Sequence, residues 1–550
     1  MFSSPLALVL CFASNVLAVP VENAAAPTVI LPYGRFQGVS SGGLTSFLGM
    51  PFARPPVGNL RFAPPRPPIQ FSGVRQATSF GNACPQQATT LPSFGKRQSL
   101  SVSEDCLFVN VVAPTSIPRG KLLPVVFWIY GGGFEDGDTS ENQGDTLVNR
   151  SIALGEPIVY VSANYRINAF GFLGGKEVKA AGIGNAGLRD QRFAMEWVQQ
   201  HVIAFGGDPT KVTIWGESAG AISVGLQMVV NDGFTGGLFR GAFMESGSPL
   251  FLSDIITSGQ EPYDQLVGNT GCSNASDTLA CLRSVSADAL MAAVNESPNI
   301  FSFQSTKLAW MPSVDGVFLT RNAQDLVAQG LYARVPFVTG DCDDEGTIFS
   351  LSTLNLTTSD ELLDYIHSNY LPNATNADIA AIAQAYPDDV TQGSPFDTGT
   401  ANAITPEFKR LSAIQGDLIF QGPRRFFLRA ASKTQNAWSF LFKRGKVVNA
   451  PLGALHGSDL PEFLGTSNTG FLGTDALVNF VNHLNPNAPK QRSTNTTSLL
   501  SGINWLQWGS SAGAPPLLTF LDPAPTVTIT PDTYRVDAMN LLIKLAREFP

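Results

Sequence analysis

The chain has 550 residues, a formal net charge of −9 and a sequence pI near 5.1. Apolar residues make up 44% of it, enough for a sizeable core, which excludes an intrinsically disordered chain. Only 14% of the residues are charged and no run of Lys and Arg exceeds two, so binding to the phosphate backbone of nucleic acid is not expected. By length alone the chain would divide into three or four domains of ~150 residues.

The N-terminus is typical of a secretory signal peptide. An apolar run at residues 6–13 is followed by polar residues, and Val16 and Ala18 have the small-residue spacing that signal peptidase accepts. We therefore expect cleavage after Ala18 and an extracellular mature chain of residues 19–550; a buried N-terminal strand or helix is the alternative. No later stretch has 18 uninterrupted apolar residues, so no transmembrane helix is expected.

The cysteines and glycosylation sequons agree with secretion. Two short-range pairs, Cys84–Cys106 and Cys272–Cys281, would leave Cys342 free, and we expect Cys342 to be buried. No Cys/His cluster has the spacing of a metal site, so neither a metal nor a cofactor is predicted. The N-x-S/T sequons, which are candidate glycosylation sites, begin at Asn149, Asn274, Asn295, Asn355, Asn373 and Asn495.

Apolar runs alternate with amphipathic segments along the chain. Residues 124–130 (PVVFWIY), 157–163 (PIVYVSA) and 211–215 (KVTIW) predict strands, and residues 185–204 predict a helix. This alternation indicates an α/β fold with a mostly parallel sheet that is covered on both faces. There is no internal repeat or long linker, and the polar segment 485–498 is predicted to be a loop.

Three glycines and a phenylalanine, residues 131–134 (GGGF), follow the first of these strands. Backbone N–H groups in such a turn can point at a developing alkoxide, as in an oxyanion hole. A flexible turn or a phosphate cradle is the alternative. The phosphate cradle is disfavoured because the segment lacks both the Lys-Ser/Thr of a P-loop and the spacing of G-x-G-x-x-G.

Residues 216–220 (GESAG) carry the strongest local signal for chemistry. They lie between the predicted strand 211–215 and an apolar segment, residues 221–230, that can form a helix. This is the context of a nucleophile elbow, a tight turn that needs glycine at both ends and exposes a serine hydroxyl at the tip of a strand. The pattern predicts that Ser218 is a nucleophile; a structural turn serine is the alternative.

A serine nucleophile needs a base to accept its proton, and the base needs an acidic group to orient it. Among the four histidines, His456 lies in a glycine-bounded loop that can hold an imidazole at a cleft, whereas His201, His367 and His483 fall on helical patterns. The acidic segment 341–345 (DCDDE) follows a strand-like run and offers four carboxylates. The pattern alone does not choose among them, and a solvated surface loop is the alternative.

Residues 205–220 (FGGDPTKVTIWGESAG) resemble the nucleophile signature of the type-B carboxylesterase/lipase family, which includes fungal lipases, sterol esterases and cholinesterases. Residues 104–111 (EDCLFVNV) resemble its second signature. Further matching stretches are residues 51–68, 185–191 and 343–346. The resemblance covers nearly the whole mature chain. It implies an α/β-hydrolase fold, with a large central, mostly parallel mixed sheet flanked by helices, in a single catalytic domain spanning residues 19–550.

Carried over residue by residue, the resemblance implies that Ser218 is the nucleophile, His456 the base and Glu345 the acid. It thereby selects Glu345 from the four carboxylates of the acidic segment, a choice that the pattern alone leaves open. This Ser-His-Glu triad would hydrolyse carboxylic esters in two acyl-transfer steps through an acyl-enzyme.

The resemblance also assigns residues around the triad. The N–H groups of Gly132, Gly133 and Ala219 would form the oxyanion hole, and Ser246 falls where the family often has a serine near the triad. The disulfides of the family correspond to Cys84–Cys106 and Cys272–Cys281.

The expected partners are small-molecule carboxylic esters with an apolar acyl or alcohol part. The chain has 37 phenylalanines, which suits an apolar pocket, and Phe134 and Phe349 are the candidates closest in sequence to the predicted site. The substrate stays open among soluble short-chain esters, triacylglycerols, sterol esters and feruloyl-type esters. A catalytically silent esterase-like binding protein and a serine peptidase are the alternatives from other classes.

The loop between Cys84 and Cys106 bears on the choice of substrate. In the lipases of the family this loop is a long flap whose amphipathic helix covers the site, but here it has 21 residues. Its large apolar side chains are Leu91, Phe94, Leu100 and Val102. These are too few for a lipid-binding helix, so we expect a short or absent lid and action on dispersed or soluble esters. Lys96-Arg97 in this loop is a candidate site for a dibasic-specific protease, with an ordinary exposed basic pair as the alternative.

Overall fold

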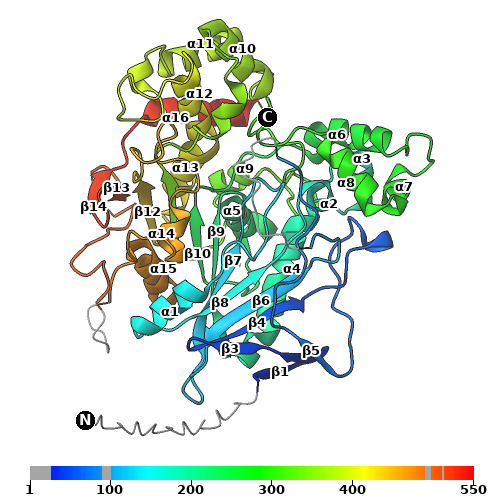
Figure 1. The fold of residues 1–550 in the computed structure, drawn as a ribbon. Coiled ribbons are helices and arrows are strands. Elements are labelled where there is room, and N and C mark those ends of the chain that lie inside the picture. The colour runs from blue at the N-terminus through cyan, green and yellow to red at the C-terminus, as the bar shows by residue number, and fades with distance from the viewer. Residues whose placement is uncertain (1–25, 90–100, 490–496, 511–512, 550) are drawn as a thin grey trace, which may run out of the picture.

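The computed structural model describes residues 26–89, 101–489, 497–510 and 513–549. Its main sheet contains β3 (Val39–Ser41), β4 (Leu44–Pro51), β6 (Phe108–Pro114), β7 (Leu123–Ile129), β8 (Val159–Ala163), β9 (Gly207–Glu217), β10 (Gly241–Glu245), β11 (Phe337–Cys342), β12 (Ala437–Phe442), β13 (Pro516–Phe520) and β14 (Val527–Pro531). A small second sheet at the base of Figure 1 contains β1 (Thr28–Leu31), β2 (Gly34–Gln37) and β5 (Val74–Gln76).

The main sheet has 11 strands in the order β14-β13-β12-β11-β10-β9-β7-β8-β6-β4-β3. Neighbouring strands run parallel from β8 through β7 and β9 to β13, and the pairs at both ends of the order are antiparallel. Strands β8, β10, β11, β12 and β13 are buried at every position, as expected for parallel strands with both faces covered. The predicted α/β fold with a mostly parallel sheet is confirmed.

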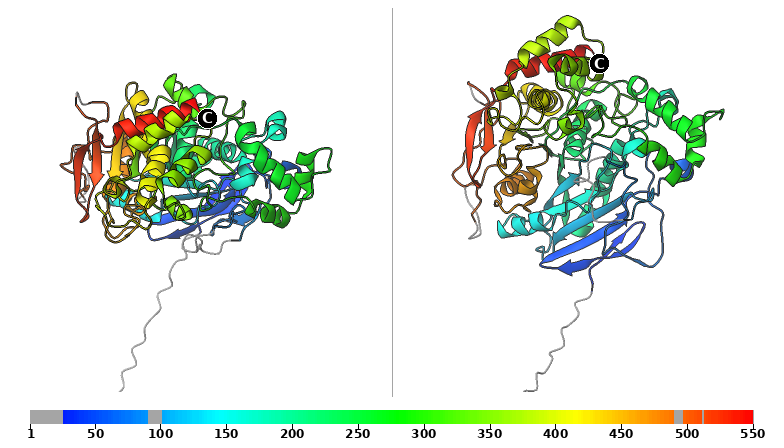
Figure 2. Two further views of the ribbon diagram at one scale, coloured as in Figure 1. Left: turned by 90° about the horizontal axis from the view of Figure 1, so that it is seen from above. Right: turned by 45° about the horizontal axis from the view of Figure 1, so that its top comes forward.

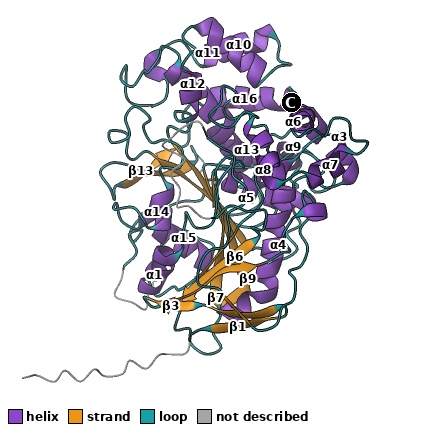
Figure 3. Ribbon diagram, turned by 45° about the vertical axis from the view of Figure 1, so that its right-hand side comes forward, coloured by secondary structure: helices purple, strands orange, loops and turns teal. Residues whose placement is uncertain are grey.

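Helices cover both faces of this sheet (Figure 3). They are α1 (Asp145–Ala153), α2 (Asn168–Phe172), α3 (Lys176–Ala181), α4 (Ala186–His201), α5 (Ala219–Val229), α6 (Ile255–Asn269), α7 (Thr278–Ser284), α8 (Ala287–Asn295), α9 (Ala323–Ala328), α10 (Ser359–Asn369), α11 (Asn376–Ala385), α12 (Phe408–Gly416), α13 (Gly422–Ala431), α14 (Leu460–Leu464), α15 (Leu472–His483) and α16 (Val536–Glu548). Helices α1, α14 and α15 lie on one face, and α4 and α5 lie on the other (Figure 1). None of the helices in the described part of the chain is long and apolar enough to span a membrane.

The elements predicted around the elbow are confirmed. The run 124–130 forms β7, the run 157–163 forms β8, and the run 211–215 lies inside β9. The predicted helix 185–204 is α4 followed by a short 3₁₀ helix, η2 (Val202–Phe205). The signal segment and part of the predicted loop 485–498 lie outside the described residues.

A layer of helices lies beyond the carboxyl ends of the parallel strands (Figures 1 and 2). Helix α16, which ends the chain, packs on α11, α13 and the π-helical turn η6 (Asp417–Gln421). Apolar side chains of α11, η6 and α16 belong to a hydrophobic cluster separate from the core of the main sheet, whereas those of α13 belong to that core. This layer therefore covers the edge of the sheet at which α/β folds bind their ligands.

Both expected disulfides, Cys84–Cys106 and Cys272–Cys281, are formed, and Cys342 is a buried free thiol. Five of the six predicted sequons fall on described residues, and each of their asparagines is exposed: Asn149, Asn274, Asn295, Asn355 and Asn373. Asn495, together with Lys96-Arg97, lies outside the described residues. Exposure makes the five asparagines accessible to glycosylation, which stays a prediction.

Candidate active site

A sharp turn joins β9 to α5, and Ser218 lies at its apex with φ 57° and ψ −127°. A β-carbon at Gly216 would lie 2.4 Å from the carbonyl carbon of Gly220, and one at Gly220 would lie 2.0 Å from the carbonyl oxygen of Ile129. The Ser218 N–H donates to the carbonyl of Glu245 at 2.8 Å, which fixes the turn to the neighbouring strand. Glycine is therefore required at both flanks, and the serine is held in a backbone conformation that side chains rarely adopt.

The loop after β12 brings His456 to this serine. The imidazole Nε2 lies 2.7 Å from Ser218 Oγ, and its Nδ1 lies 2.5 Å from Glu345 Oε2. Rings of Phe420 and Phe349 flank the imidazole at centroid distances of 4.6 and 5.1 Å. The three side chains thus form one hydrogen-bonded series, and packing on two aromatic rings limits rotation of its central member.

Glu345 follows β11 and is held on its second carboxylate oxygen. Its Oε1 accepts a hydrogen bond from Ser246 Oγ at 2.6 Å and another from the Cys342 N–H at 2.6 Å. The structure therefore brings Ser246 into contact with Glu345, next to the imidazole. With both oxygens occupied, the plane of the carboxylate is fixed relative to His456.

The other three carboxylates of the acidic segment are buried, and each has partners of its own. Asp341 pairs with Arg424 at 2.6 Å, and Asp343 pairs with Lys446 at 2.5 Å. Asp344 accepts hydrogen bonds from the backbone of the loop that carries His456. The segment is thus part of the core, and a solvated surface loop is excluded.

The other three histidines lie on helices, as their patterns predicted. His201 ends α4 and packs against the rings of Tyr33 and Trp197. His367 lies on α10, and His483 ends α15 with its Nε2 2.6 Å from Glu156 Oε2. Within the described ranges, no group of three His, Cys, Asp or Glu side chains is arranged to hold a metal ion.

Two glycines near Ser218 have positive φ angles, as in turns whose backbone N–H groups can donate to an oxyanion. Gly132 and Gly133, which follow β7, have φ of 102° and 63°. Gly133, Ala219 and Ser218 line the same cavity. Ala219 is the first residue of α5, where an N–H has no acceptor inside the helix and the helix dipole favours negative charge. Two of the three residues predicted to form the oxyanion hole, Gly133 and Ala219, therefore lie at the cavity beside Ser218.

The cavity next to Ser218 has a volume of about 370 Å³ and a mostly apolar lining. Phe134 and Phe349, the two phenylalanines singled out in the sequence, both contribute to it. Other apolar residues of the lining are Ile222, Leu250, Ile300, Leu308, Met311, Leu371, Leu418, Ile419, Phe420, Ile543, Ala546 and Phe549. Apart from Ile222, which closely follows residues 216–220, they come from parts of the chain that sequence proximity to the motifs does not indicate.

Burial shifts the protonation equilibria of the site. It lowers the pKa of His456 below its ordinary value of 6.5, which keeps the imidazole neutral and able to accept a proton. It raises the pKa of Glu345, whereas the hydrogen bonds from Ser246 and the Cys342 amide oppose that rise because they favour the ionised carboxylate. The protonation states of His456 and Glu345 therefore depend on burial and on a few fixed hydrogen-bond partners.

Glu217, which sequence reasoning missed, also contacts the imidazole. Its Oε1 lies 3.5 Å from His456 Nε2, and burial raises the pKa of Glu217 to about 8. Its position next to Ser218 in the motif is visible in the sequence, but neither its burial nor its approach to a histidine 239 positions away is.

We expect Glu217→Gln to lower kcat about tenfold above pH 8 and to change it little at pH 6. Above its raised pKa the Glu217 carboxylate is ionised and stabilises an imidazolium at His456, whereas below that pKa it is already neutral, like glutamine. Initial rates of ester hydrolysis by both proteins from about pH 6 to about pH 10 measure this difference. A ratio of rates that is constant across that range would contradict the assigned protonation.

Comparison with known proteins agrees with this geometry. A family model described as "Carboxylesterase family" matches residues 25–496. "Lipase 4" of Diutina rugosa is 42% identical over 524 residues, which cover 90% of this chain and 94% of that protein. "Secreted lipase 1" of Botryotinia fuckeliana is 40% identical over 551 residues, which cover 92% and 94% of the two chains.

Among solved structures, Aspergillus niger EstA superposes with a TM-score of 0.81 at 28% identity, over 96% of this chain and 99% of that one. The resemblance seen in the motifs is therefore confirmed over most of the chain, as is the α/β-hydrolase fold. The chain belongs to the carboxylesterase family and is a carboxylic ester hydrolase.

Proposed function

We propose that this ester hydrolase is a secreted serine enzyme in which Ser218 is the nucleophile, His456 the base and Glu345 the acid. The observation that carries the proposal is the hydrogen-bonded series from Glu345 through His456 to Ser218 beside an apolar cavity. Each member has the neighbour that its role requires, and a serine hydroxyl at that distance from an imidazole can lose its proton during attack.

In the first step His456 Nε2 accepts the Ser218 proton while Oγ bonds to the ester carbonyl carbon. The carbonyl oxygen gains the negative charge, which the N–H groups of Gly132, Gly133 and Ala219 stabilise. The intermediate then breaks its bond to the alcohol oxygen, which takes the proton from His456, and an acyl-Ser218 ester is left. Water repeats the sequence and releases the acid, so no cofactor is needed.

Glu345 supports both steps from the far side of the imidazole. Its carboxylate accepts a hydrogen bond from the Nδ1–H of His456, which fixes the tautomer with Nε2 free to accept a proton. It also stabilises the imidazolium during each transition state. We propose that Ser246 is a positioning residue, because its hydroxyl holds the other oxygen of Glu345.

For the substrate we propose dispersed or soluble esters with an apolar acyl or alcohol part. The apolar cavity supports the apolar part, and the short loop between Cys84 and Cys106 supports a small lid. Of the apolar side chains of that loop, Val102 is 54% exposed, while residues 90–100 lie outside the described residues. Sterol esters and feruloyl-type esters stay open as substrates.

Triacylglycerol hydrolysis is the second candidate. It is favoured by the names of the relatives, which are lipases, and by the number of apolar residues around the cavity.

Extracellular action is supported by the N-terminal signal pattern and by the relative named as a secreted lipase. Sequencing the N-terminus of the protein recovered from culture medium tests this; a mature chain that does not begin at Val19 would contradict cleavage after Ala18.

A fluorophosphonate probe tests the assigned nucleophile, because it reacts only with an activated serine. We expect one label per chain, located at Ser218 by peptide mass spectrometry. Labelling of another residue, or of none, would contradict the proposed nucleophile. Rates on p-nitrophenyl esters of increasing chain length, methyl ferulate, a cholesteryl ester and an emulsified triglyceride then define the substrate class.

The short loop predicts weak interfacial activation. We expect the rate on a short triglyceride to rise smoothly as its concentration passes the solubility limit, because no long apolar flap has to be moved by an interface. The measurement is the initial rate by pH-stat titration on either side of that limit. A sharp increase at the limit would favour the lipase candidate over the proposed esterase.

A further inference from the structure

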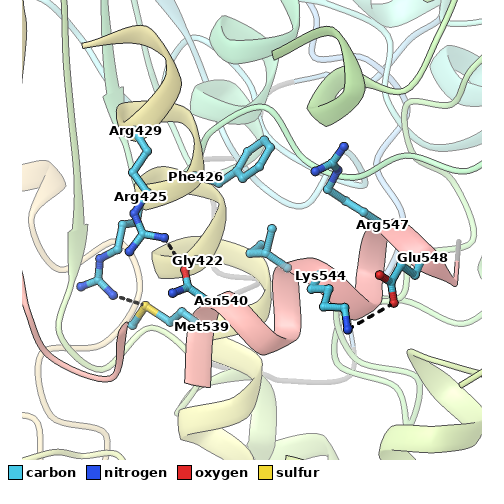
Figure 4. A pocket seen from close by; sticks show the side chains of 10 residues that line it. Gly422, Arg425, Phe426, Arg429, Met539, Asn540, Lys544, Arg547 and Glu548 are labelled. Atoms are coloured by element: carbon cyan, nitrogen blue, oxygen red, sulfur yellow. Dashed lines mark hydrogen bonds and ion pairs between the residues drawn. The ribbon is translucent and has the colours of Figure 1, made fainter. Parts of the chain in front are cut away.

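A second cavity of about 370 Å³ lies between α13 and α16, and none of the proposed catalytic residues lines it (Figure 4). This volume is within the range of small-molecule sites, ~300–1,000 Å³. Its charged lining is almost entirely cationic, with Arg425, Arg429, Lys544 and Arg547 against Glu548. A concentration of positive charge is unexpected in a chain whose net charge is −9.

Arg429 carries a charge that the fold leaves without an ionic partner. Arg425 is neutralised by Asp532 at 2.5 Å, but across the described residues no carboxylate lies within 4 Å of Arg429. The Nη1 of Arg429 donates a hydrogen bond to the amide oxygen of Asn540. Burial and the like charge of Arg425 lower the pKa of Arg429, and Asp532 and Asp537 oppose that shift only in part, so a bound anion would favour the charged guanidinium further.

The positive charges that α16 contributes to the cavity, on Lys544 and Arg547, are also only partly compensated by carboxylates. Arg547 donates from Nη2 to Asp325 at 3.0 Å, but its Nε is buried and has no hydrogen-bond partner. Lys544 Nζ is 3.8 Å from Glu548 Oε2, too far for a hydrogen bond, and its side chain is 63% exposed. In Figure 4 Lys544 and Arg547 project from α16, with the Lys544 amine directed toward Glu548, and Arg429 projects from α13.

Apolar groups complete the lining. Phe426 of α13 lies between Arg429 and Arg547 in Figure 4, and Ile543 and Met539 of α16 contribute aliphatic surface. Ile543 also lines the cavity next to Ser218, so the two cavities share this side chain. Cationic donors beside aromatic and aliphatic surface suit an anion that has an apolar portion.

We propose that this cavity binds the carboxylate of an aliphatic acid. Arg429 and Lys544 supply the charge, and Phe426 and Ile543 contact the aliphatic chain. Guanidinium groups match the two oxygens of a carboxylate, and charge-assisted hydrogen bonds of this kind are about twice as strong as neutral ones. The choice of an aliphatic acid as the ligand rests on the proposed function, because ester hydrolysis produces such an acid. The inference that the cavity binds an anion does not depend on the proposed function.

Titration calorimetry with sodium octanoate at constant ionic strength tests the proposal. Octanoate binding is measured on the wild-type protein before and after a long-chain alkyl fluorophosphonate has filled the cavity next to Ser218. We expect one octanoate site to persist after labelling. If Ser218 does not react, the nucleophile assignment fails, and binding to the unlabelled protein still tests the anion site by itself.

Arg429→Gln should weaken octanoate binding about tenfold, since it removes a charge-assisted hydrogen bond. Lys544→Gln, an exposed position where folding is not at risk, should weaken it about threefold. Arg321→Gln, which removes an exposed arginine paired with Asp232, is the matched control and should change nothing. Unchanged affinity in both cavity variants, or octanoate binding no tighter than that of inorganic phosphate, would overturn the proposal.

Discussion

Replacing Ser218 with alanine is expected to lower kcat by about 10⁶-fold while the fold stays intact. The hydroxyl is the atom that bonds to the acyl carbon, and no other side chain can take its position at the tip of β9. Alanine is smaller than serine and keeps the same backbone, so packing around the turn changes little. Purified Ser218→Ala should therefore match the wild type in far-UV circular dichroism and melting temperature, and single-turnover assays should detect almost no product.

Ser246→Ala is the matched control, because it removes a hydroxyl that touches Glu345 and not the substrate. Losing one hydrogen bond to a carboxylate, ~1.5–3 kcal/mol, would lower kcat about tenfold and leave KM nearly unchanged. The two serines thus differ by about five orders of magnitude in expected effect. Turnover by Ser218→Ala above about one percent of wild type would contradict the assigned nucleophile.

Removing Arg424 is expected to destabilise the fold by about 3–5 kcal/mol. Its guanidinium is fully buried and pairs with Asp341 at 2.6 Å and with Asp532 at 3.0 Å, and both carboxylates are themselves buried. In Arg424→Met, Asp341 is left without a counter-charge and Asp532 keeps only Arg425. An uncompensated buried charge is far more costly than the loss of a surface pair. Urea unfolding, followed by tryptophan fluorescence, measures the change in the free energy of unfolding.

The comparison with Arg321→Met isolates the effect of burial. Arg321 also pairs with an aspartate, at 2.7 Å, but the two side chains are 41% and 55% exposed. Such exposed pairs contribute ~0–1 kcal/mol, so this variant should unfold close to the wild type. Equal destabilisation by the two variants would show that the buried network around Arg424 has no special energetic role.

The pH dependence of this difference follows from Asp532. Arg424 and Arg425 hold the pKa of Asp532 below its ordinary value of 3.8. A depressed carboxylate pKa contributes stability above the unfolded pKa, and that contribution is lost as the pH falls through the folded pKa. The part of the stability gap between wild type and Arg424→Met that comes from Asp532 should therefore be fully present above pH 3.8 and should be lost in stronger acid.

The sequence by itself predicted the α/β fold, which the structure confirms, and it predicted a nucleophile at Ser218. Both follow from local chemistry: alternating apolar strands specify a buried parallel sheet, and the flanking glycines of residues 216–220 permit a turn that a β-carbon would block. The same reasoning selected His456, because its loop is bounded by Gly453 and Gly457, which have φ of 72° and 77°. Each of these signals consists of residues that are close to one another in the sequence. A linear pattern is therefore enough to recognise each one.

Only the tertiary structure decided what each carboxylate of the acidic segment contacts. The residues at 341, 343, 344 and 345 are chemically alike and adjacent, yet Glu345 meets a histidine 111 residues away while Asp341 meets an arginine 83 residues away. Resemblance to a family selected Glu345; the local pattern did not. The approach of Glu217 to His456 and the contribution of α16 to the cavity lining also depend on contacts between segments that are distant in the sequence. Burial and long-range partners set the charge and contacts of such groups, and both arise only when distant segments pack together.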